Sequence, residues 1–309
     1  MEHIFLVNPA AGKEDPTPVA QRAAAQLEKA LGEPCTIQIS RAPGELTELA
    51  RKAGASGNEV RLYACGGDGT FHEVVAGAME FPNVAVTCLP LGSGNDFIKQ
   101  FPHPEAFFRM EEFENTVEKR LDLMDVSGCV AVNVCSVGFD ARIGTQIDRY
   151  RRLPLLSGPR AYWASVVVNL IRGVVKPCRV ELQEGPVVDE DMTLACVCNG
   201  SWYGGSFHPV PEADSSDGLL DVLLVKKVSR LTVARVIAAY QKGHYADYPN
   251  LIAHYQTKRL RIVTPEKEPV NLDGELIHSR DITIQLLPGK LRLFGPAAAW
   301  ENKPMHRKA

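Results

Sequence analysis

The chain has 309 residues, of which 45% are hydrophobic and 23% are charged, as is usual for a folded globular protein. These values exclude a disordered or fibrous chain, and the length suits about two domains. The 34 basic and 37 acidic side chains give a net charge of −3, which argues against binding to nucleic acid through overall charge. The first residues lack the basic start and apolar stretch of a secretory signal. We therefore expect a cytoplasmic protein with reduced cysteines.

Strand-like apolar runs and helix-like segments alternate over the first hundred or so residues. The pattern predicts helices that begin at Thr17, where Thr17 is the cap, at residue 44 and after Thr70. It predicts strands over residues 3–7, 35–39, 60–65 and 84–89. Such alternation is typical of a doubly wound α/β domain with a mostly parallel sheet, whose ligands bind beyond the carboxyl ends of the strands.

From about residue 121 the pattern changes to short strand-like runs bounded by turn residues, at 121–126, 131–137, 178–182, 192–198, 219–225, 260–263, 270–272, 282–287 and 291–294. Helices are expected only near residues 140–151, 159–172 and 230–240. This pattern is typical of a mainly antiparallel β-sandwich. We therefore predict an α/β domain over residues 1–121, to which the tail 297–309 could return, and a β-sandwich domain over residues 122–296, with a cleft between them.

The strongest local motif is Gly66-Gly67-Asp68-Gly69-Thr70, which follows the strand expected over residues 60–65. Its glycines permit a tight turn that a polyanion can approach closely, and the amides of the next helix attract phosphate. Asp68 in such a turn indicates an accompanying Mg²⁺. The alternative is an ordinary glycine turn in which Asp68 caps the helix.

Two more loops follow strands of the same predicted sheet. Residues 92–96 read Gly-Ser-Gly-Asn-Asp, and residues 8–13 read Asn-Pro-Ala-Ala-Gly-Lys. Because the carboxyl ends of parallel strands meet at one edge of a sheet, the three loops together predict a nucleotide site. Neither a GxxxxGK[ST] loop nor a GxGxxG loop occurs, which excludes a Walker A site and weakens a dinucleotide interpretation. Lys13 alone could equally be a solvated turn residue.

Two Asp-Gly turns mark the carboxyl half. Residues 214–221 form an acidic turn whose carbonyl and carboxylate oxygens could bind a hard divalent cation, or they form an ordinary hairpin turn. Residues 271–275 form the second turn, and Glu275 could act there as a base. The alternative for Glu275 is a plain hairpin carboxylate.

Taken in order, these segments resemble the soluble bacterial diacylglycerol kinase and lipid kinase family, whose catalytic domain is related to that of sphingosine and ceramide kinases. The resemblance covers nearly the whole chain, and its further matching segments are Asp122, Gly138-Phe139-Asp140-Ala141, Tyr203-Gly204-Gly205 and Asp217-Gly218-Leu219-Leu220-Asp221. It implies an amino-terminal nucleotide-binding domain of the NAD kinase and diacylglycerol kinase type, followed by a β-sandwich lipid-binding domain.

The resemblance also implies a reaction. ATP and Mg²⁺ would serve transfer of a phosphoryl group to the primary hydroxyl of diacylglycerol or a related lipid, giving phosphatidic acid or an analogue for phospholipid biosynthesis. Glu275 would be the general base in the interdomain cleft, and Asp68, Asp96 and Asp122 would hold the catalytic Mg²⁺ through water. A structural Mg²⁺ would bind the carbonyls of Asp214 and Leu219 and the carboxylate of Asp217.

For the nucleotide, the resemblance implies contacts with a larger set of residues: Asn8, Pro9, Ala10, Ala11, Gly12, Lys13, Ser40, Gly66, Gly67, Asp68, Gly69, Thr70, Phe71, His72, Glu73, Ser93 and Asn95. Ser93 stands where threonine is frequent in the family and His72 where asparagine is frequent. Ser206 and His208 depart from the family pattern on the expected lipid side.

A lipid substrate implies peripheral contact with the inner face of the membrane, without nucleic acid as a partner. The basic and apolar residues 148–156, within the basic segment 149–160, could make this contact, or they form a helix end with a solvated basic face. A small-molecule kinase of the NAD kinase type is an alternative function, although its GSTAY-like segment is absent. A non-catalytic nucleotide or lipid sensor is a second alternative function. The chain could also form a homodimer.

Overall fold

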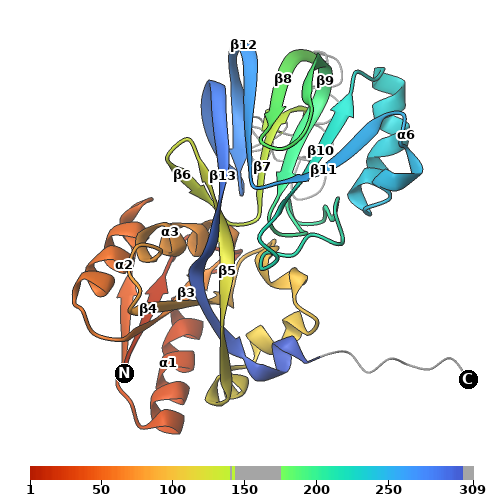
Figure 1. The fold of residues 1–309 in the computed structure, drawn as a ribbon. Coiled ribbons are helices and arrows are strands. Elements are labelled where there is room, and N and C mark those ends of the chain that lie inside the picture. Colours follow the sequence, from red (N-terminus) through yellow and green to blue (C-terminus); the bar gives the residue numbers. More distant parts are fainter. Residues whose placement is uncertain (140, 143–174, 302–309) are drawn as a thin grey trace, which may run out of the picture. The chain divides into compact units, whose positions relative to one another are not determined.

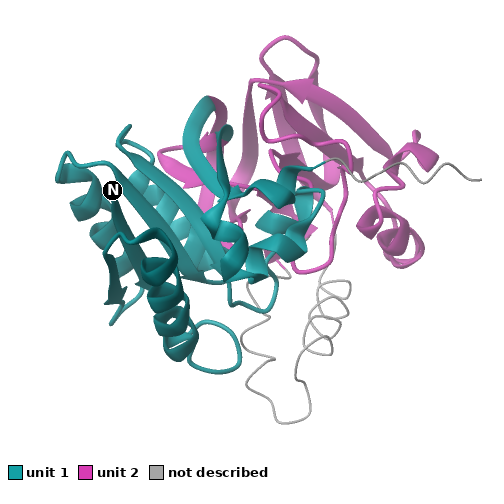
Figure 2. Ribbon diagram, turned by 90° about the horizontal axis from the view of Figure 1, so that it is seen from below, with its two compact units in different colours: residues 1–122, 288–309 teal, residues 123–287 magenta. Residues whose placement is uncertain are grey.

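The computed structural model describes residues 1–139, 141–142 and 175–301, and the chain divides into two compact units (Figure 2). Unit 1 comprises Met1–Asp122 and Pro288–Ala309, and unit 2 comprises Leu123–Leu287. The chain thus returns to unit 1 at Pro288, whereas the sequence suggested a return at residue 297. The helices expected near residues 140–151 and 159–172, and the segments 148–156 and 149–160, lie outside the described residues. Within the described ranges, no helix is both long enough and apolar enough to span a bilayer.

Unit 1 is built on a parallel sheet with the strand order β4-β3-β1-β2 (Figure 1). Its strands are β1 (Glu2–Val7), β2 (Cys35–Ile39), β3 (Val60–Gly66) and β4 (Val84–Pro90). All three of their pairings are parallel. The inner strands are apolar and buried along nearly their whole length, as expected for a sheet with both faces covered. The predicted parallel sheet is therefore present.

Three helices connect these strands: α1 (Thr17–Leu31), α2 (Glu45–Ala55) and α3 (Asp68–Ala78). Thr17 is the first residue of α1 rather than its cap, and its N–H donates to Asp15 Oδ1 at 2.8 Å. Helices α2 and α3 pack closely because Gly77 has no side chain, and a Cβ there would lie 2.2 Å from Thr47 O. These connections place the amino end of α3 directly after β3.

The end of the chain completes the core of unit 1. After β4 come three short 3-10 helices (Phe97–Gln100, Pro104–Phe108 and Met110–Glu114), and a fourth lies at Ala297–Trp300. Tyr63 of β3 stacks on Phe5, with ring centroids 4.3 Å apart, and meets the edge of Phe294 at 5.1 Å. Phe294 is fully buried in this aromatic cluster. The chain is therefore already part of the core of unit 1 before the short helix at Ala297–Trp300.

Unit 2 is mainly antiparallel, with the strand order β11-β10-β9-β7-β12-β13. Its strands are β6 (Cys129–Ala131), β7 (Val134–Gly138), β8 (Lys176–Leu182), β9 (Val187–Cys198), β10 (Leu220–Lys226), β11 (Ile252–Thr257) and β12 (Arg259–Leu272). Strands β5 (Thr116–Val126) and β13 (Glu275–Pro296) have residues in both units. β12 and β13 each join two runs that the sequence suggested were separate strands.

The two faces of β9 take part in two different hydrophobic clusters of unit 2. Ala195 and Val197 belong to one, together with β12 and β13 residues, and Leu194 and Cys196 belong to the other. The second cluster includes residues of α6 (Arg230–Gln241) and contacts the short helix Tyr245–Asp247. Helix α6 therefore covers one face of this sheet (Figure 1).

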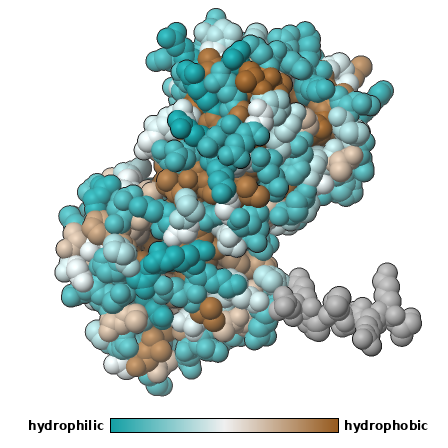
Figure 3. Space-filling model, viewed as in Figure 1, coloured by the Kyte–Doolittle hydropathy of each residue, from teal (hydrophilic) through white to brown (hydrophobic). Residues whose placement is uncertain are grey.

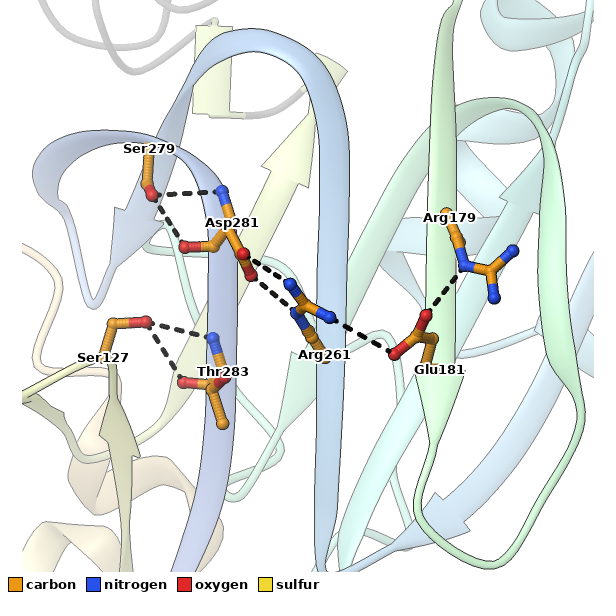
Figure 4. A network of polar contacts seen from close by, with 7 residues as sticks. All are labelled: Ser127, Arg179, Glu181, Arg261, Ser279, Asp281 and Thr283. Atoms are coloured by element: carbon orange, nitrogen blue, oxygen red, sulfur yellow. Dashed lines mark hydrogen bonds and ion pairs between the residues drawn. The ribbon is translucent and has the colours of Figure 1, made fainter.

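The outer surface of β8, β12 and β13 carries a ladder of charged side chains. Figure 4 shows Arg261 between two acidic residues: it donates to Asp281 at 2.8 and 2.6 Å and lies 3.8 Å from Glu181. Exposed ion pairs of this kind add little to the free energy of folding. They join side chains of strands that are neighbours in the sheet. Hydrophilic residues cover most of the face of the molecule that Figure 3 shows.

Candidate functional site

The three glycine-containing loops of unit 1 meet at the carboxyl edge of its sheet, as predicted. The side-chain amide of Asn8, after β1, donates to Thr70 Oγ1 at 3.2 Å. The N–H of Leu91, after β4, donates to Gly66 O at 2.8 Å. Gly12 lies against the same residue, since a Cβ there would be 2.5 Å from Leu91 O. The loops are therefore in mutual contact.

The second and third of these loops touch through their glycines. A Cβ on Gly92 would lie 2.2 Å from Gly67 Cα, so the two backbones approach with no room for a side chain. Asn95 holds its loop in this shape: its φ is 50°, its Oδ1 accepts the Gly92 N–H at 3.1 Å, and its Nδ2 donates to Pro90 O at 3.2 Å. The contacts described for Asn95 thus shape the loop.

Helix α3 begins at this junction. Its cap residue is Gly67, and its first intrahelical bond runs from Phe71 N to Gly67 O at 3.0 Å. The amides of Asp68, Gly69 and Thr70 precede that bond, and such first-turn amides carry the partial positive charge that attracts phosphate oxygens. The arrangement can therefore hold part of a polyphosphate.

Unit 1 also contains the three carboxylates predicted to hold the catalytic Mg²⁺. Asp68 Oδ1 accepts the N–H of Phe97 at 3.0 Å, which ties the start of α3 to the loop after β4. Asp96 is buried and lies 2.6 Å from Lys99 Nζ. Asp122 is buried and accepts the N–H of Gly289 at 2.7 Å. These contacts fix the three carboxylates in place.

Among the described residues, no group of three or more His, Cys, Asp or Glu side chains is arranged to hold a metal ion directly. The described residues of unit 1 therefore offer no cage of direct carboxylate ligands. Carboxylates are nevertheless the hard oxygen donors that suit Mg²⁺, which usually keeps several waters. Binding through water, as the family resemblance implied, is compatible with this donor set and stays a prediction.

Other residues assigned to the nucleotide have clear structural contacts. Glu73 Oε2 accepts the N–H of Gly44 at 3.0 Å and so holds the start of α2. The Phe71 side chain is buried and packs on Phe97, with ring centroids 4.2 Å apart. Ser40 is buried, and its N–H donates to Val7 O at 2.9 Å. Thr70 is also buried. The other remaining side chains of the set are exposed or half-buried at the loops, as Lys13, His72 and Ser93 are.

In unit 2, Asp273 anchors the turn between β12 and β13. Asp273 and the next residue, Gly274, have φ values of 54° and 104°. The Asp273 carboxylate accepts the N–H groups of three consecutive residues at the start of β7: Val132 and Asn133, just before the strand, at 2.5 and 2.9 Å, and Val134, its first residue, at 2.8 Å. This carboxylate is a structural anchor, a role that the sequence did not reveal.

Glu275 follows this anchored turn as the first residue of β13, opposite Leu272. Its side chain is exposed. In the described part of the chain its carboxylate has no hydrogen-bond or ion-pair partner. A carboxylate on a fixed turn, without a competing donor, can accept a proton from an approaching hydroxyl group.

The acidic turn at residues 214–219 is closed by its own hydrogen bonds. Asp217 N donates to Asp214 O at 3.3 Å, and Leu219 N donates to Asp217 Oδ1 at 2.9 Å. Gly218 takes a φ of 78°. These bonds suffice for an ordinary Asp-Gly turn, so the structural Mg²⁺ on this turn stays a prediction.

Asp221, just after that turn, has partners that the sequence did not indicate. It is 2% exposed. His254 Nε2 lies 2.7 Å from its Oδ1, and Gln256 Nε2 donates to the same oxygen at 3.1 Å. Tyr245 contacts His254, and burial together with Glu212 raises the pKa of Tyr245 above its ordinary value. Asp221 therefore links β10 to β11.

An apolar pocket lies in unit 2 between α6 and the face of the sheet that it covers. Leu194 of β9 and Ile252 of β11 line it on the sheet side, and Val236, Ile237 and Tyr240 line it on the helix side. The lining is almost entirely apolar, so the pocket suits an apolar ligand.

A short aromatic hairpin borders this pocket. Tyr203 and Phe207, which form a β-bridge, both line the pocket. Beside them, the His208 ring stacks on Trp202, with centroids 4.1 Å apart and planes 9° apart. Burial lowers the pKa of His208. The sequence had marked His208 as a departure from the family pattern, and it directly follows Phe207, which lines the apolar pocket.

Comparison with known proteins agrees with this architecture. Residues 2–129 match the diacylglycerol kinase catalytic domain, and residues 133–295 match the YegS C-terminal NAD kinase β-sandwich-like domain. The protein is thus of the class in which a kinase catalytic domain of α/β type precedes a β-sandwich. It belongs to the lipid kinase family that these two domains define, which confirms the family resemblance and the predicted fold.

Individual relatives cover nearly the full chain. It is 27% identical over 297 residues to a "Probable lipid kinase YegS-like" of Chromohalobacter salexigens, covering 92% of this chain and 91% of the relative. It is 24% identical over 275 residues to the diacylglycerol kinase of Bacillus subtilis, covering 88% of each. The crystal structure of a "putative diacylglycerol kinase" from Bacillus anthracis has the same fold, with a TM-score of 0.76, 23% identity and coverage of 96% and 98%.

A more distant likeness is to an NAD kinase from Archaeoglobus fulgidus, solved in complex with ATP. Its TM-score is 0.51 at 13% identity, with coverage of 97% of this chain and 96% of that one. At this identity the likeness concerns the fold alone. It agrees with the predicted relation between the diacylglycerol kinase and NAD kinase folds.

Proposed function

We propose that this protein is an ATP- and Mg²⁺-dependent kinase that phosphorylates the primary hydroxyl of diacylglycerol or a closely related lipid at the inner face of the membrane. The observation that carries the proposal is the junction of three loops at the amino end of α3, where Gly67 and Gly92 touch. Such a junction leaves backbone amides accessible to phosphate. The related fold of the archaeal NAD kinase was solved with ATP bound, which supports a nucleotide here.

The residues of unit 1 would bind the nucleotide and leave its terminal phosphate ready for transfer. The first amides of α3 would hold phosphate oxygens, and Asp68, Asp96 and Asp122 would hold Mg²⁺ through water. The bound Mg²⁺ would neutralise charge on the phosphates. In phosphoryl transfer, charge spreads over the equatorial oxygens, so positioning and electrostatic stabilisation supply most of the catalysis.

Glu275 would accept the proton of the lipid hydroxyl. As that proton moves to its carboxylate, the hydroxyl oxygen forms a bond to the γ-phosphorus, and the bond from this phosphorus to the bridging oxygen of ADP breaks. The products are a phosphorylated lipid and ADP, and the proton leaves Glu275 for solvent. A positioned base of this kind contributes about 10²–10⁴-fold to the rate. The hydrogen bonds of Asp273 support this role because they fix the turn.

The apolar pocket of unit 2 favours a lipid acceptor. Its aliphatic and aromatic lining suits acyl chains, whereas a dinucleotide acceptor would require polar and charged partners. The names of the relatives, lipid kinase and diacylglycerol kinase, point the same way. His208, which directly follows the pocket residue Phe207, would contact the polar end of such a lipid.

The direct test is a panel of acceptors. The purified protein is incubated with Mg²⁺, ATP labelled in the γ-phosphate, and diacylglycerol, sphingosine or NAD, and the products are separated by thin-layer chromatography. We expect label in phosphatidic acid. Label in NADP alone would replace the proposal by an NAD kinase, and absence of transfer to every acceptor would favour a non-catalytic sensor.

A further inference from the structure

The outer face of α6 exposes one large apolar side chain. Leu231, in the first turn, is 73% exposed, the highest value for a large hydrophobic side chain in the described part of the chain. The start of the helix is stabilised by Ser229, the cap residue, whose Oγ accepts the N–H of Thr232 at 3.1 Å. Isolated exposed leucines are common on protein surfaces. Whether the exposed Leu231 marks a binding surface therefore depends on the residues around it.

All charged side chains of α6 are basic. Arg230 precedes it, and Arg235 lies four residues later, on the same side of the helix. The helix contains no Asp or Glu. Both arginines are exposed, and neither has an ion-pair partner among the described residues. Nearby Lys227 pairs with Asp191 at 2.9 Å. The outer face of the first half of α6 is therefore both basic and apolar.

The inner face of the same helix lines the apolar pocket. Val233, Val236 and Ile237 face the pocket from α6, and Val228, just before the helix, lines it as well. Thr232 also lines the pocket, although it directly follows the exposed Leu231. Helix α6 thus lies between the pocket and its own basic and apolar outer face. The helix is at the periphery of unit 2 (Figures 1 and 2).

We propose that Leu231, Arg230 and Arg235 form a docking surface for an anionic lipid bilayer. This inference rests on the proposed function, because it assigns the surface through which the lipid substrate is reached. Leu231 enters the interfacial region, and the two arginines contact lipid phosphates, an arrangement that combines apolar burial with attraction to anionic lipid. The bilayer then lies against the helix whose inner face lines the pocket. Leu231 on the outer face is next in the chain to Thr232, which lines the pocket, so the docked bilayer would lie one helix diameter from the pocket.

The test is sedimentation of the full chain with vesicles of phosphatidylcholine alone or mixed with phosphatidylglycerol. We expect the protein to sediment with the anionic vesicles only. Arg230→Ala/Arg235→Ala should weaken this binding by about 30-fold, because each basic side chain near an anionic surface contributes about a factor of five. Leu231→Ser should weaken it by about tenfold, the loss expected for a leucine side chain that is only partly buried.

Matched controls separate this surface from general effects of charge and hydrophobicity. Arg22→Ala/Lys29→Ala removes two exposed basic residues of another helix, α1. Phe108→Ser removes a side chain of unit 1 that is 59% exposed. Both controls should bind the vesicles as the unaltered protein does. Equal binding by the α6 variants, or no binding of the unaltered protein to anionic vesicles, would overturn the docking surface.

A second readout distinguishes this inference from the proposed kinase activity. With short-chain diacylglycerol in detergent micelles, the α6 variants should phosphorylate as fast as the unaltered protein, whereas with diacylglycerol in anionic vesicles they should be slower by the factor found in sedimentation. Absence of activity in micelles for the unaltered protein would contradict the proposed function alone. Equal rates on vesicles for all proteins would contradict the docking surface alone.

Discussion

Gly67 and Gly92 come from loops after two neighbouring strands, and their backbones touch so closely that a Cβ on Gly92 would lie 2.2 Å from Gly67 Cα. This contact sets the shape of the junction at which α3 begins. Any side chain at Gly92 must therefore push apart the loops that we assign to the nucleotide.

We expect Gly92→Ala to destabilise the protein by about 1–3 kcal/mol, the usual cost of overpacking, and to weaken ATP binding strongly. Gly69→Ala is the matched control for stability, because nothing lies within 4 Å of a Cβ there. In the first turn of α3, alanine should leave the stability unchanged or slightly raised. Urea unfolding and calorimetric titration with ATP measure both effects. Unchanged stability of Gly92→Ala would contradict the tight contact.

The pocket under α6 yields a prediction about the acceptor. Val236→Phe places a larger side chain inside the pocket, so we expect a higher KM for long-chain diacylglycerol and an unchanged KM for ATP. Ala238→Phe adds the same ring at an exposed position of the helix and should change neither value in detergent micelles. Steady-state kinetics with each substrate varied in turn make the comparison. Equal effects of the two variants would remove the acyl chain from this pocket.

The buried His3 should make the free energy of unfolding depend on pH. It is 1% exposed, and burial lowers its pKa below the ordinary 6.5 even though its Nε2 lies 3.0 Å from Glu33 Oε2. The unfolded chain therefore binds the proton more readily than the folded one. The stabilisation is complete above the unfolded pKa and is lost as the pH falls from that value through the lowered pKa of the folded state.

We accordingly expect the free energy of unfolding to fall between about pH 7 and pH 5, and His3→Gln to flatten that slope while lowering stability at neutral pH. The control is His244→Gln, at a side chain that is 59% exposed, which should keep the slope of the unaltered protein. Urea unfolding at several pH values provides the data. A His3→Gln variant with an unchanged slope would show that this histidine does not carry the dependence.

Much of unit 1 was predictable because its signals are local. Hydrophobic strands, glycine loops and helix starts follow one another in the chain, and parallel pairing then brings the loops to one edge. The roles of Glu73 and Asp273 were not predictable, because their partners lie far away in the sequence. Asp273 binds backbone amides of residues 132–134, and no pattern within a single segment reports such a contact.

The strands of unit 2 were harder to delimit for a similar reason. Thr264, Pro265, Glu266 and Lys267 interrupt the apolar pattern and suggested a loop, yet β12 continues through them, with a shift of register after Val263. β11 was missed because its sequence is largely polar. β11 is held as a strand by its pairing with β10, which includes the contact between Asp221 and His254. Its own residues do not indicate this pairing.

The central claim is that Glu275 of unit 2 serves as the base for transfer of a phosphate held by unit 1. Its most direct test is the rate of label transfer from ATP to diacylglycerol by Glu275→Gln, compared with ATP affinity from calorimetric titration. Glu266→Gln, which alters an exposed carboxylate of the neighbouring strand β12, is the control. We predict that Glu275→Gln slows transfer by about 10²–10⁴-fold with unchanged ATP affinity, while the control remains fully active. A Glu275→Gln protein that transfers phosphate at the normal rate would contradict the claim.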